Sequence, residues 1–258
     1  MKVLLLGATG NVGSRLIPAL IAHKHQVVVF VRSASKLPST AKTQLTAVVE
    51  GDGTDSDAIK AAILKENCGA VINAADLAAM TRWHAPSQLP KIFAAVAKAA
   101  VEAGKERGGP PLRCWFLSGF NLLDGPKEPH LLADYLPFFP EHRQNYIFIQ
   151  KYSPKTDLAW SLFCANLLTP RHTPAAYPHP TEATADNLVA AADVPPAWSD
   201  KWKGIPVVGT FLNILVNASG YRAPLEDCAD FLAADLEKGL GSEWVGKRVG
   251  LKVKPRAG

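Results

Sequence analysis

Cysteine is scarce in this chain of 258 residues, and the four cysteines that it has lie far apart. They stand at positions 68, 114, 164 and 228, so no pair has the short spacing of a metal-ligating or redox-active motif. The same separations exclude the compact disulfide framework of small secreted domains. We therefore expect a reduced, cytoplasmic protein, in which Cys164 is a core thiol because no basic partner stands beside it.

Long hydrophobic runs are also missing. The apolar start of the chain ends at Gly7, which is too early for the core of a signal peptide. The longest later run, Ile205–Val216, has twelve residues and is interrupted by Gly209 and Asn213. A run of that length is too short to cross a bilayer, so we expect a soluble protein.

Acidic residues are absent from the last twelve positions, which carry five bases: Lys247, Arg248, Lys252, Lys254 and Arg256. The other 23 bases balance the 23 acids, so the net charge of +5 arises at the terminus, where such an end is typically solvated. A neutral body has no broad basic face, so we expect neither nucleic acid nor a membrane as a partner. No HxxH or His–carboxylate spacing indicates a metal site, and three loop histidines are expected to be solvated: His130, His172 and His179.

Proline is rare in the first 85 residues, and there short apolar runs alternate with amphipathic stretches. The apolar runs, continued further along the chain, predict strands at residues 2–6, 26–31, 45–49, 70–73, 113–117 and 160–164. The intervening stretches predict helices at residues 12–23 (kinked at Pro18), 54–66 (capped by Thr54 or Asp55), 87–103 and 141–151. Apolar strands separated by helices predict an α/β fold, a Rossmann-type doubly wound parallel sheet.

The pattern becomes less regular after residue 120. Phe120–Pro140 reads as a long proline-rich loop, and residues 166–224 read as mostly loop with one helix near 181–192. An apolar stripe that ends at Gly239 predicts a late helix, and residues 245–253 predict a last strand. The loop-rich part is therefore expected to build a substrate site.

The strongest signal is the glycine-rich turn Gly7-Ala8-Thr9-Gly10-Asn11-Val12-Gly13, between the first strand and the first helix. In this context Gly7 permits the tight turn, Gly10 lets backbone amides approach a pyrophosphate, and Gly13 lets the helix pack close to the sheet. The N-terminus of the helix also favours an anion. The turn predicts dinucleotide binding.

The end of the second strand selects the cofactor. An acid at this place bonds a ribose 2′-hydroxyl, whereas an arginine suits a 2′-phosphate. This chain has Arg32 there, with Lys36 nearby and no acid before Val49, so we expect NADP(H). We therefore divide the chain into an NADP-binding Rossmann domain, residues 1–165, and a smaller substrate-binding segment, residues 166–258, that partly returns to the core.

The run Lys2–Gly13 resembles the atypical short-chain dehydrogenase/reductase family, and within it the NmrA-like and biliverdin-IXβ-reductase-like branch. Further motifs agree with this resemblance: Gly51–Asp55, Val71–Ala75, Leu117–Gly119, Glu226–Phe231 and Val245–Val249. The resemblance makes Lys247 and Arg248 part of a closing strand. It implies that the cofactor is bound by Gly7, Thr9, Gly10, Asn11, Val12, Asp52, Gly53, Ala74, Ala75 and Ser118, besides Arg32 and Lys36.

One departure from the family concerns the chemistry. Typical members pair a tyrosine with a lysine four residues later, but here Tyr146 is followed at that offset by Gln150, so the dyad is absent. The same helix offers His142 and Tyr146, an i,i+4 pair on one face. We expect three catalytic residues, with Ser118 and Tyr146 holding the substrate oxygen and His142, whose pKa suits neutral acid–base work, or water supplying the proton.

These features predict an NADPH-dependent reductase of a small apolar or aromatic carbonyl, quinone or enone. Two alternatives stay open, namely a non-catalytic NADP-binding regulator, which NmrA-like proteins suggest, and a non-redox isomerase or cyclase. The partner is a small-molecule substrate, and a homodimer is left open. Loop aromatics could line a flat substrate or hold the loops in place: Trp83, Phe138, Phe139 and Tyr177.

Overall fold

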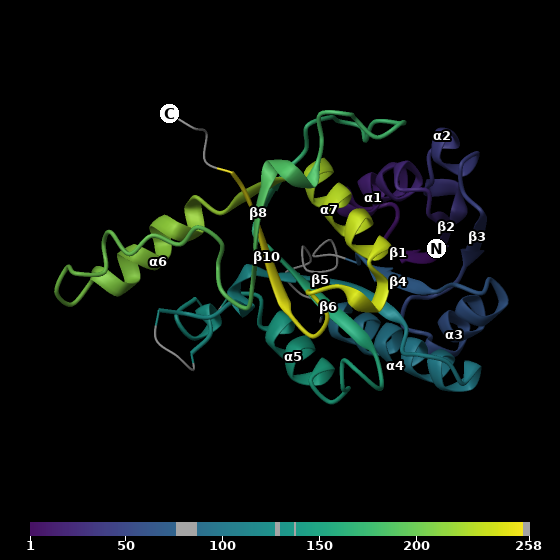
Figure 1. The fold of residues 1–258 in the computed structure, drawn as a ribbon, viewed down its shortest axis with the longest axis horizontal. Coiled ribbons are helices and arrows are strands. Elements are labelled where there is room, and N and C mark those ends of the chain that lie inside the picture. The colour runs from purple at the N-terminus through teal and green to yellow at the C-terminus, as the bar shows by residue number, and fades with distance from the viewer. Residues whose placement is uncertain (76–86, 127–129, 137, 255–258) are drawn as a thin grey trace.

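The computed structural model describes residues 1–75, 87–126, 130–136 and 138–254. At its centre lies an eight-stranded sheet with the order β3-β2-β1-β4-β5-β6-β10-β8 (Figure 1). Edge strand β8 is antiparallel to β10, and the other neighbouring strands are parallel. The strands are β1 (Lys2–Leu6), β2 (Gln26–Val31), β3 (Ala47–Glu50), β4 (Ala70–Asn73), β5 (Arg113–Gly119), β6 (Ala159–Ala165), β8 (Leu188–Ala192) and β10 (Arg248–Val253).

Helices cover both faces of this sheet, because alternate residues of a strand point to opposite sides. On β1, Leu4 and Leu6 pack in the cluster shared with α3, α4 and α5, whereas Val3 and Leu5 pack in the cluster shared with α1 and α7. The expected doubly wound α/β fold is thus confirmed. The helices are α1 (Asn11–Ala22), α2 (Ser39–Lys42), α3 (Ser56–Lys65), α4 (Leu89–Arg107), α5 (Pro140–Ile149), α6 (Gly209–Ser219) and α7 (Leu225–Glu237).

The first part of the chain follows the sequence prediction closely. Strands β1, β2 and β4 have the predicted bounds, and β3 begins two residues later than predicted. The Asp55 side chain caps α3 by accepting the N–H groups of Asp57 and Ala58. Pro18 lies inside α1 and has no N–H for the carbonyl of Ser14, which instead accepts the hydroxyl of Tyr177 at 3.0 Å.

The second part departs from the prediction. The helix expected near residues 181–192 is wrong, because this segment holds a 3-10 turn and strand β8, which pairs with β10. The helix of this region is α6, which overlaps the second half of the apolar run at residues 205–216. It is followed by β9 (Arg222–Pro224), which pairs with β7 (Leu167–Thr169) in a second, two-stranded sheet. Of the helices that the structure describes, none has the length and apolarity to span a membrane.

The basic C-terminus is also not a solvated tail in its described part. Strand β10 lies between β6 and β8 in the main sheet. Arg248 is buried and forms ion pairs with Asp124 and Asp193. Lys247 also pairs with Asp193, at 2.9 Å. The charges of Lys247 and Arg248 are therefore matched by two partly buried acids, whereas Lys254 is exposed and Arg256 lies outside the described residues.

Candidate functional site

The glycine-rich turn between β1 and α1 forms a cradle that side chains would fill. Gly7 has φ +76°, and a Cβ at this residue would lie 2.4 Å from the backbone of Ala74 at the end of β4. A Cβ at Gly13 would lie 2.1 Å from the Gly7 carbonyl oxygen. The Gly10 N–H bonds that same oxygen at 2.9 Å, which closes the turn, and Thr9 is exposed at its tip. The cradle therefore exposes backbone to a ligand, as a pyrophosphate requires.

Helix α1 presents its N-terminus at this cradle. Gly10 is the N-cap and gives no side-chain cap, and Asn11 and Val12 open the first turn. The Arg15 guanidinium fixes this turn through two hydrogen bonds. Its Nη1 donates to the Asn11 carbonyl at 3.0 Å, and its Nε donates to Glu226 Oε1 at 3.0 Å. The first turn is thereby tied to α7.

The predicted adenosine-side residues lie at the ends of β2, β3 and β4. Arg32 and Lys36 are exposed, and Gly53 packs near Ile92. The backbone and hydroxyl of Thr54 donate to Asp52 and, with a smaller effect of Arg32, lower the pKa of that carboxyl. Ala74 is buried against the Gly7 turn, and Ala75 lines the cavity described next.

Sequence reasoning missed one acid in this region. Glu50, the last residue of β3, accepts the N–H of Ala34, just beyond Arg32. The register pairs Val31 with Glu50, so the parallel strands bring this carboxylate beside the end of β2. The sequence predicts that the third strand ends at Val49. Extending this strand by one residue would have placed Glu50 at its carboxyl end, beside the end of β2.

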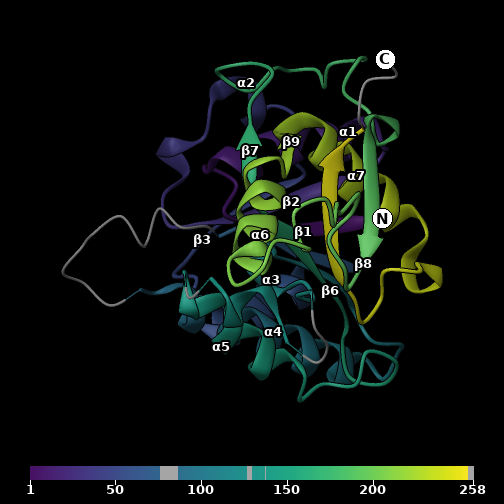
Figure 2. The same cartoon turned by 90° about the vertical axis from the view of Figure 1, so that its left-hand side faces the viewer.

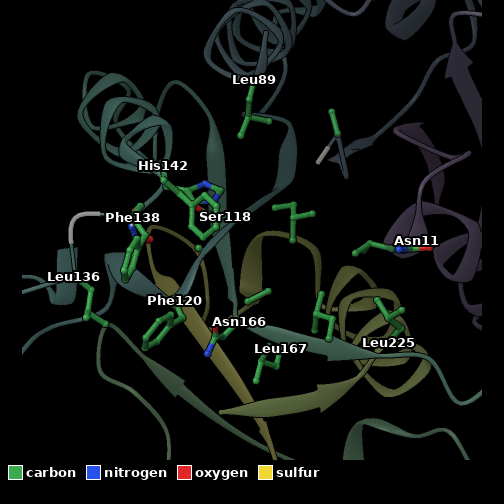
Figure 3. Close-up of a pocket in the computed structure, with 18 of the residues that line it drawn as sticks. Asn11, Leu89, Ser118, Phe120, Leu136, Phe138, His142, Asn166, Leu167 and Leu225 are labelled. Carbon is green, nitrogen blue, oxygen red and sulfur yellow. The ribbon is translucent and has the colours of Figure 1, made fainter. Parts of the chain in front are cut away.

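A cavity of about 370 Å³ opens at the carboxyl ends of β5 and β6 (Figure 3). It extends from the first turn of α1 to the start of α5, and most of its lining is apolar. In Figure 3, Asn11 and Phe138 lie on opposite sides of it. The lining residues are Asn11, Val12, Ala75, Leu89, Leu117, Ser118, Gly119, Phe120, Asn121, Leu136, Phe138, Phe139, His142, Ala165, Asn166, Leu167, Leu168, Pro170 and Leu225.

Ser118 and His142 both line this cavity (Figure 3). Both are buried, and Ser118 Oγ and His142 Nδ1 have no hydrogen-bond partner in the part of the chain that the structure describes. A Cβ on Gly119 would lie 2.5 Å from the His142 ring, so the glycine lets the imidazole pack on the end of β5. Buried polar atoms without partners are rare and mark a place where a ligand can bind.

The protonation of His142 differs from expectation. Burial lowers the pKa of its imidazole to about 4. Desolvation penalises the charged form, and no acidic side chain compensates for it among the causes of the shift. The expected titration near neutral pH is therefore wrong, and His142 is a neutral donor and acceptor at pH 7.

Tyr146 lies one turn further along α5 and does not line the cavity. The Arg248 guanidinium stands 5.1 Å from the centre of its ring. Burial raises the pKa of the half-buried Tyr146 phenol, and Arg248 opposes this shift. The structure thus brings two of the three predicted catalytic residues together and places Tyr146 elsewhere.

Of the other residues singled out in the sequence, some lie at the cavity and some lie elsewhere. Phe138 and Phe139 line the cavity, Tyr177 lies against α1, and Trp83 is outside the described residues. Cys164 is buried in the core, and burial raises the pKa of its thiol. His130 and His172 are exposed, but the prediction for His179 is wrong, because its side chain is 5% exposed and bonds the Ala183 carbonyl.

Sequence reasoning also missed two cavity asparagines. Asn121 Nδ2 donates to the Phe138 carbonyl at 2.8 Å and fixes the loop before α5, and Asn166 donates to the Ala218 carbonyl at 2.8 Å. Asn166 follows directly after β6, and that strand-end position was its only signal in the sequence. No group of metal-ligating side chains is found among the residues that were placed.

Comparisons with known proteins agree with this geometry. A family model described as NAD(P)H-binding matches residues 7–194. The oxidoreductase ylbE from Lactococcus lactis is 17% identical with a TM-score of 0.62, and the match covers 100% of this chain and 93% of that one. A Rossmann-fold NAD(P)-binding family protein from Shigella flexneri is 15% identical with a TM-score of 0.60 (coverage 100% and 95%). A short-chain dehydrogenase/reductase from Veillonella parvula is 13% identical with a TM-score of 0.63 (coverage 98% and 94%). A search of curated proteins finds no sequence that matches this chain.

Proposed function

This chain belongs to the NAD(P)H-binding family, and we propose that it is an NADPH-dependent reductase of a small apolar or aromatic carbonyl, quinone or enone. Within the family we place it in the atypical short-chain dehydrogenase/reductase branch that includes NmrA-like and biliverdin-IXβ-reductase-like proteins. Its four free cysteines suit a reducing compartment, which we take to be the cytoplasm.

The residues of the glycine-rich turn fit a dinucleotide. The closed Gly7–Gly10 turn and the approach of Gly13 leave backbone amides of α1 free to hold a pyrophosphate. When bound, NADPH supplies a hydride, and the chain supplies position, a dry cavity and hydrogen bonds. Arg32 and Lys36 would hold the 2′-phosphate, and Asp52 and Ala75 would flank the adenosine. The Glu50 carboxylate accepts the Ala34 N–H, so a 2′-phosphate that bound this N–H would have to displace the Glu50 carboxylate.

The cavity favours a substrate that needs little acid assistance. His142 is neutral at pH 7, and Tyr146, which has no lysine partner at the usual offset, does not line the cavity. A saturated ketone needs a strong proton donor, whereas a quinone or enone spreads negative charge over a conjugated system. Ser118 would donate to the substrate oxygen, the neutral His142 ring would add one N–H donor or acceptor, and water would deliver the proton.

The observation that carries this proposal is the pair of unpartnered buried atoms, Ser118 Oγ and His142 Nδ1, in an apolar cavity that also touches the dinucleotide turn. The test is NADPH oxidation by the purified protein with a panel of quinones, enones and aldehydes. We expect turnover with quinones or enones. Removal of one donor by Ser118→Ala should lower kcat about 10- to 100-fold.

The control variant is Ser161→Ala. Ser161 is also a buried strand serine, but it donates to the Trp244 carbonyl and does not line the cavity. A wild-type kcat in Ser118→Ala would show that the cavity around Ser118 is not the active site. Tight NADPH binding without turnover on any acceptor would favour a regulator, and product formation without net NADPH consumption would favour an isomerase or cyclase.

A further inference from the structure

A helical arm projects from the body of the molecule. It comprises residues 198–219, contains α6, and extends away from the main sheet in Figure 1; in Figure 2, which is turned so that this side faces the viewer, α6 lies in front of the sheet. Most of its apolar side chains face solvent, whereas Ile214 is buried in the core. The exposed ones are Trp202, Ile205, Val207, Val208, Phe211, Leu212, Leu215 and Val216, each 37% exposed or more.

The polarity of α6 is inverted relative to an ordinary surface helix. Val208, Phe211, Leu212 and Leu215 recur at helical spacing and form one apolar stripe, which faces outward. Asn213 and Asn217 occupy the opposite, buried side together with Ile214. An apolar stripe of this regularity on the outside of a helix marks a surface that another apolar phase covers.

Hydrogen bonds from the buried asparagines hold the arm in a defined conformation. Asn217 accepts the N–H of Ser199 at 2.9 Å and donates to its carbonyl at 2.8 Å. Asn213 accepts the N–H of Trp202 at 3.1 Å. These bonds fold the segment before α6 back along the helix and leave the apolar stripe free.

The charges around the stripe are mainly positive. Lys201 and Lys203 flank Trp202 at the start of the arm, and Arg222 follows its end. Asp200, which lies 3.6 Å from Lys203, is the one acid of residues 198–225. Lysine beside tryptophan at the edge of an apolar face is typical of helices that lie in a lipid–water interface.

We propose that this arm docks on the surface of an anionic lipid bilayer, with the apolar stripe of α6 in the headgroup region and Lys201, Lys203 and Arg222 at the phosphates. The expectation of no membrane partner rested on a neutral body and on the lack of a spanning segment. Neither observation bears on a short helix that lies in the interface.

A second copy of the chain fits this surface less well. The Lys203 backbone lies beside Gly209 at the start of α6, so antiparallel pairing of two arms would bring Lys203 of one copy toward Arg222 of the other, and like charges in contact oppose association. A bilayer supplies the opposite charge. It also supplies a flat apolar phase, which a projecting arm can reach without a complementary groove.

The arm is attached at the rim of the candidate active site. The Ala218 carbonyl near the end of α6 accepts the Asn166 amide, and Leu167, which bonds the Tyr221 carbonyl, lines the cavity. Phe138, at the same cavity, is 62% exposed. Docking would thus bring the cavity close to the bilayer, where an apolar quinone or enone dissolves; this last step rests on the proposed function.

The test is co-sedimentation of the full-length protein with vesicles of phosphatidylcholine alone and of equimolar phosphatidylcholine and phosphatidylglycerol. We expect binding to the anionic vesicles. The double variant Phe211→Ser/Leu215→Ser should lower the partition coefficient at least about tenfold. The variant Lys201→Gln/Lys203→Gln should lower it about 30-fold on anionic vesicles only.

The control is Leu240→Ser, which removes a side chain that is 45% exposed on the turn after α7 and should leave vesicle binding unchanged. Absence of wild-type binding to anionic vesicles would overturn the proposal. So would a dimer in solution that Phe211→Ser/Leu215→Ser converts to a monomer, because the stripe would then be an interface between copies. NADPH oxidation with a water-soluble acceptor, measured without vesicles, tests the proposed function separately and should be equal in wild type and arm variants.

Discussion

At the scale of single residues, the choice between the two nicotinamide cofactors depends on Arg32. Arg32 is exposed at the end of β2, where its guanidinium can pair with a 2′-phosphate. A charge-assisted hydrogen bond to such a group contributes about 2 kcal/mol. We therefore predict that Arg32→Ala weakens NADPH binding about 10- to 100-fold and leaves NADH binding nearly unchanged, as measured by calorimetric titration of both cofactors.

The matched control for this prediction is Arg222→Ala, an exposed arginine next to the arm. It should change neither cofactor's Kd. Equal losses of NADPH and NADH affinity in Arg32→Ala would mean that this arginine holds the strand end and not the 2′-phosphate.

The sequence could predict the position of a site residue that stands at the end of a strand. It could not predict a property, such as the protonation state of a histidine, that depends on burial by a loop. Ser118 lies at the end of one apolar strand and Ala75 lies two residues after another, so parallel topology alone brings them to one edge of the sheet. The neutral state of His142 depends on the loop that covers it, and the Asn121–Phe138 bond that fixes this loop has no signature in the sequence. Helical spacing put His142 and Tyr146 on one face, but the cavity reaches only the first of them.

At the scale of elements, a buried ion pair joins the cofactor helix to the late helix. Arg15 on α1 is 4% exposed, and Glu226 on α7 is 1% exposed. Glu226 also accepts the N–H groups of Arg171 and His172, so one carboxylate fixes two helices and the loop after β7. The pair therefore holds the first turn of α1 in position.

We predict that Glu226→Gln lowers the free energy of unfolding by about 3–5 kcal/mol, because it leaves the Arg15 charge buried without its partner. Urea denaturation measures this loss. Glu102→Gln is the control, since its partner Lys98 is exposed and such pairs contribute less than about 1 kcal/mol. A loss of that small size in Glu226→Gln would show that water or backbone groups compensate for the charge.

Most elements of the first 165 residues could be predicted because most of the strands are apolar on both faces and the longer helices have one apolar side, but the short helix α2 was not predicted. The later elements could not. Leu188–Ala192 is a short apolar run that suits a helix or a strand equally, and only the free edge of β10 makes it a strand. The outward stripe of α6 likewise resembles a core stripe in sequence, because spacing does not tell which side faces the protein.

At the scale of the whole molecule, the two parts of the chain share one core. Helix α7 packs on α1, and β10 lies in the main sheet beside β6. We keep the division into residues 1–165 and 166–258 as a proposal about roles, cofactor binding and substrate binding. The return of α7 and β10 to the first part means that stability belongs to the whole chain.

Two histidines give this shared stability opposite dependences on pH. The pKa of His142 falls from 6.5 in the unfolded chain to about 4 in the folded one. Between these values the unfolded chain binds a proton that the folded chain does not, so acid lowers stability. At His23 burial opposes the charge, but hydrogen bonds to Asp230 and Glu237 prevail and raise its pKa above 6.5. Its contribution is therefore full below pH 6.5 and is lost as pH rises through the folded pKa.

We predict that the free energy of unfolding of the wild type, measured with urea at pH about 7 and about 4, contains an acid-induced loss of about 3 kcal/mol from His142. In His142→Gln this loss should disappear, whatever the variant's stability at neutral pH. In His23→Gln the loss on acidification should become larger, because the stabilising imidazolium is gone. A His142→Gln variant with the same pH dependence as wild type would mean that water reaches the imidazole in the folded protein, and the neutral hydrogen-bonding role assigned to it in the cavity would fail with that result.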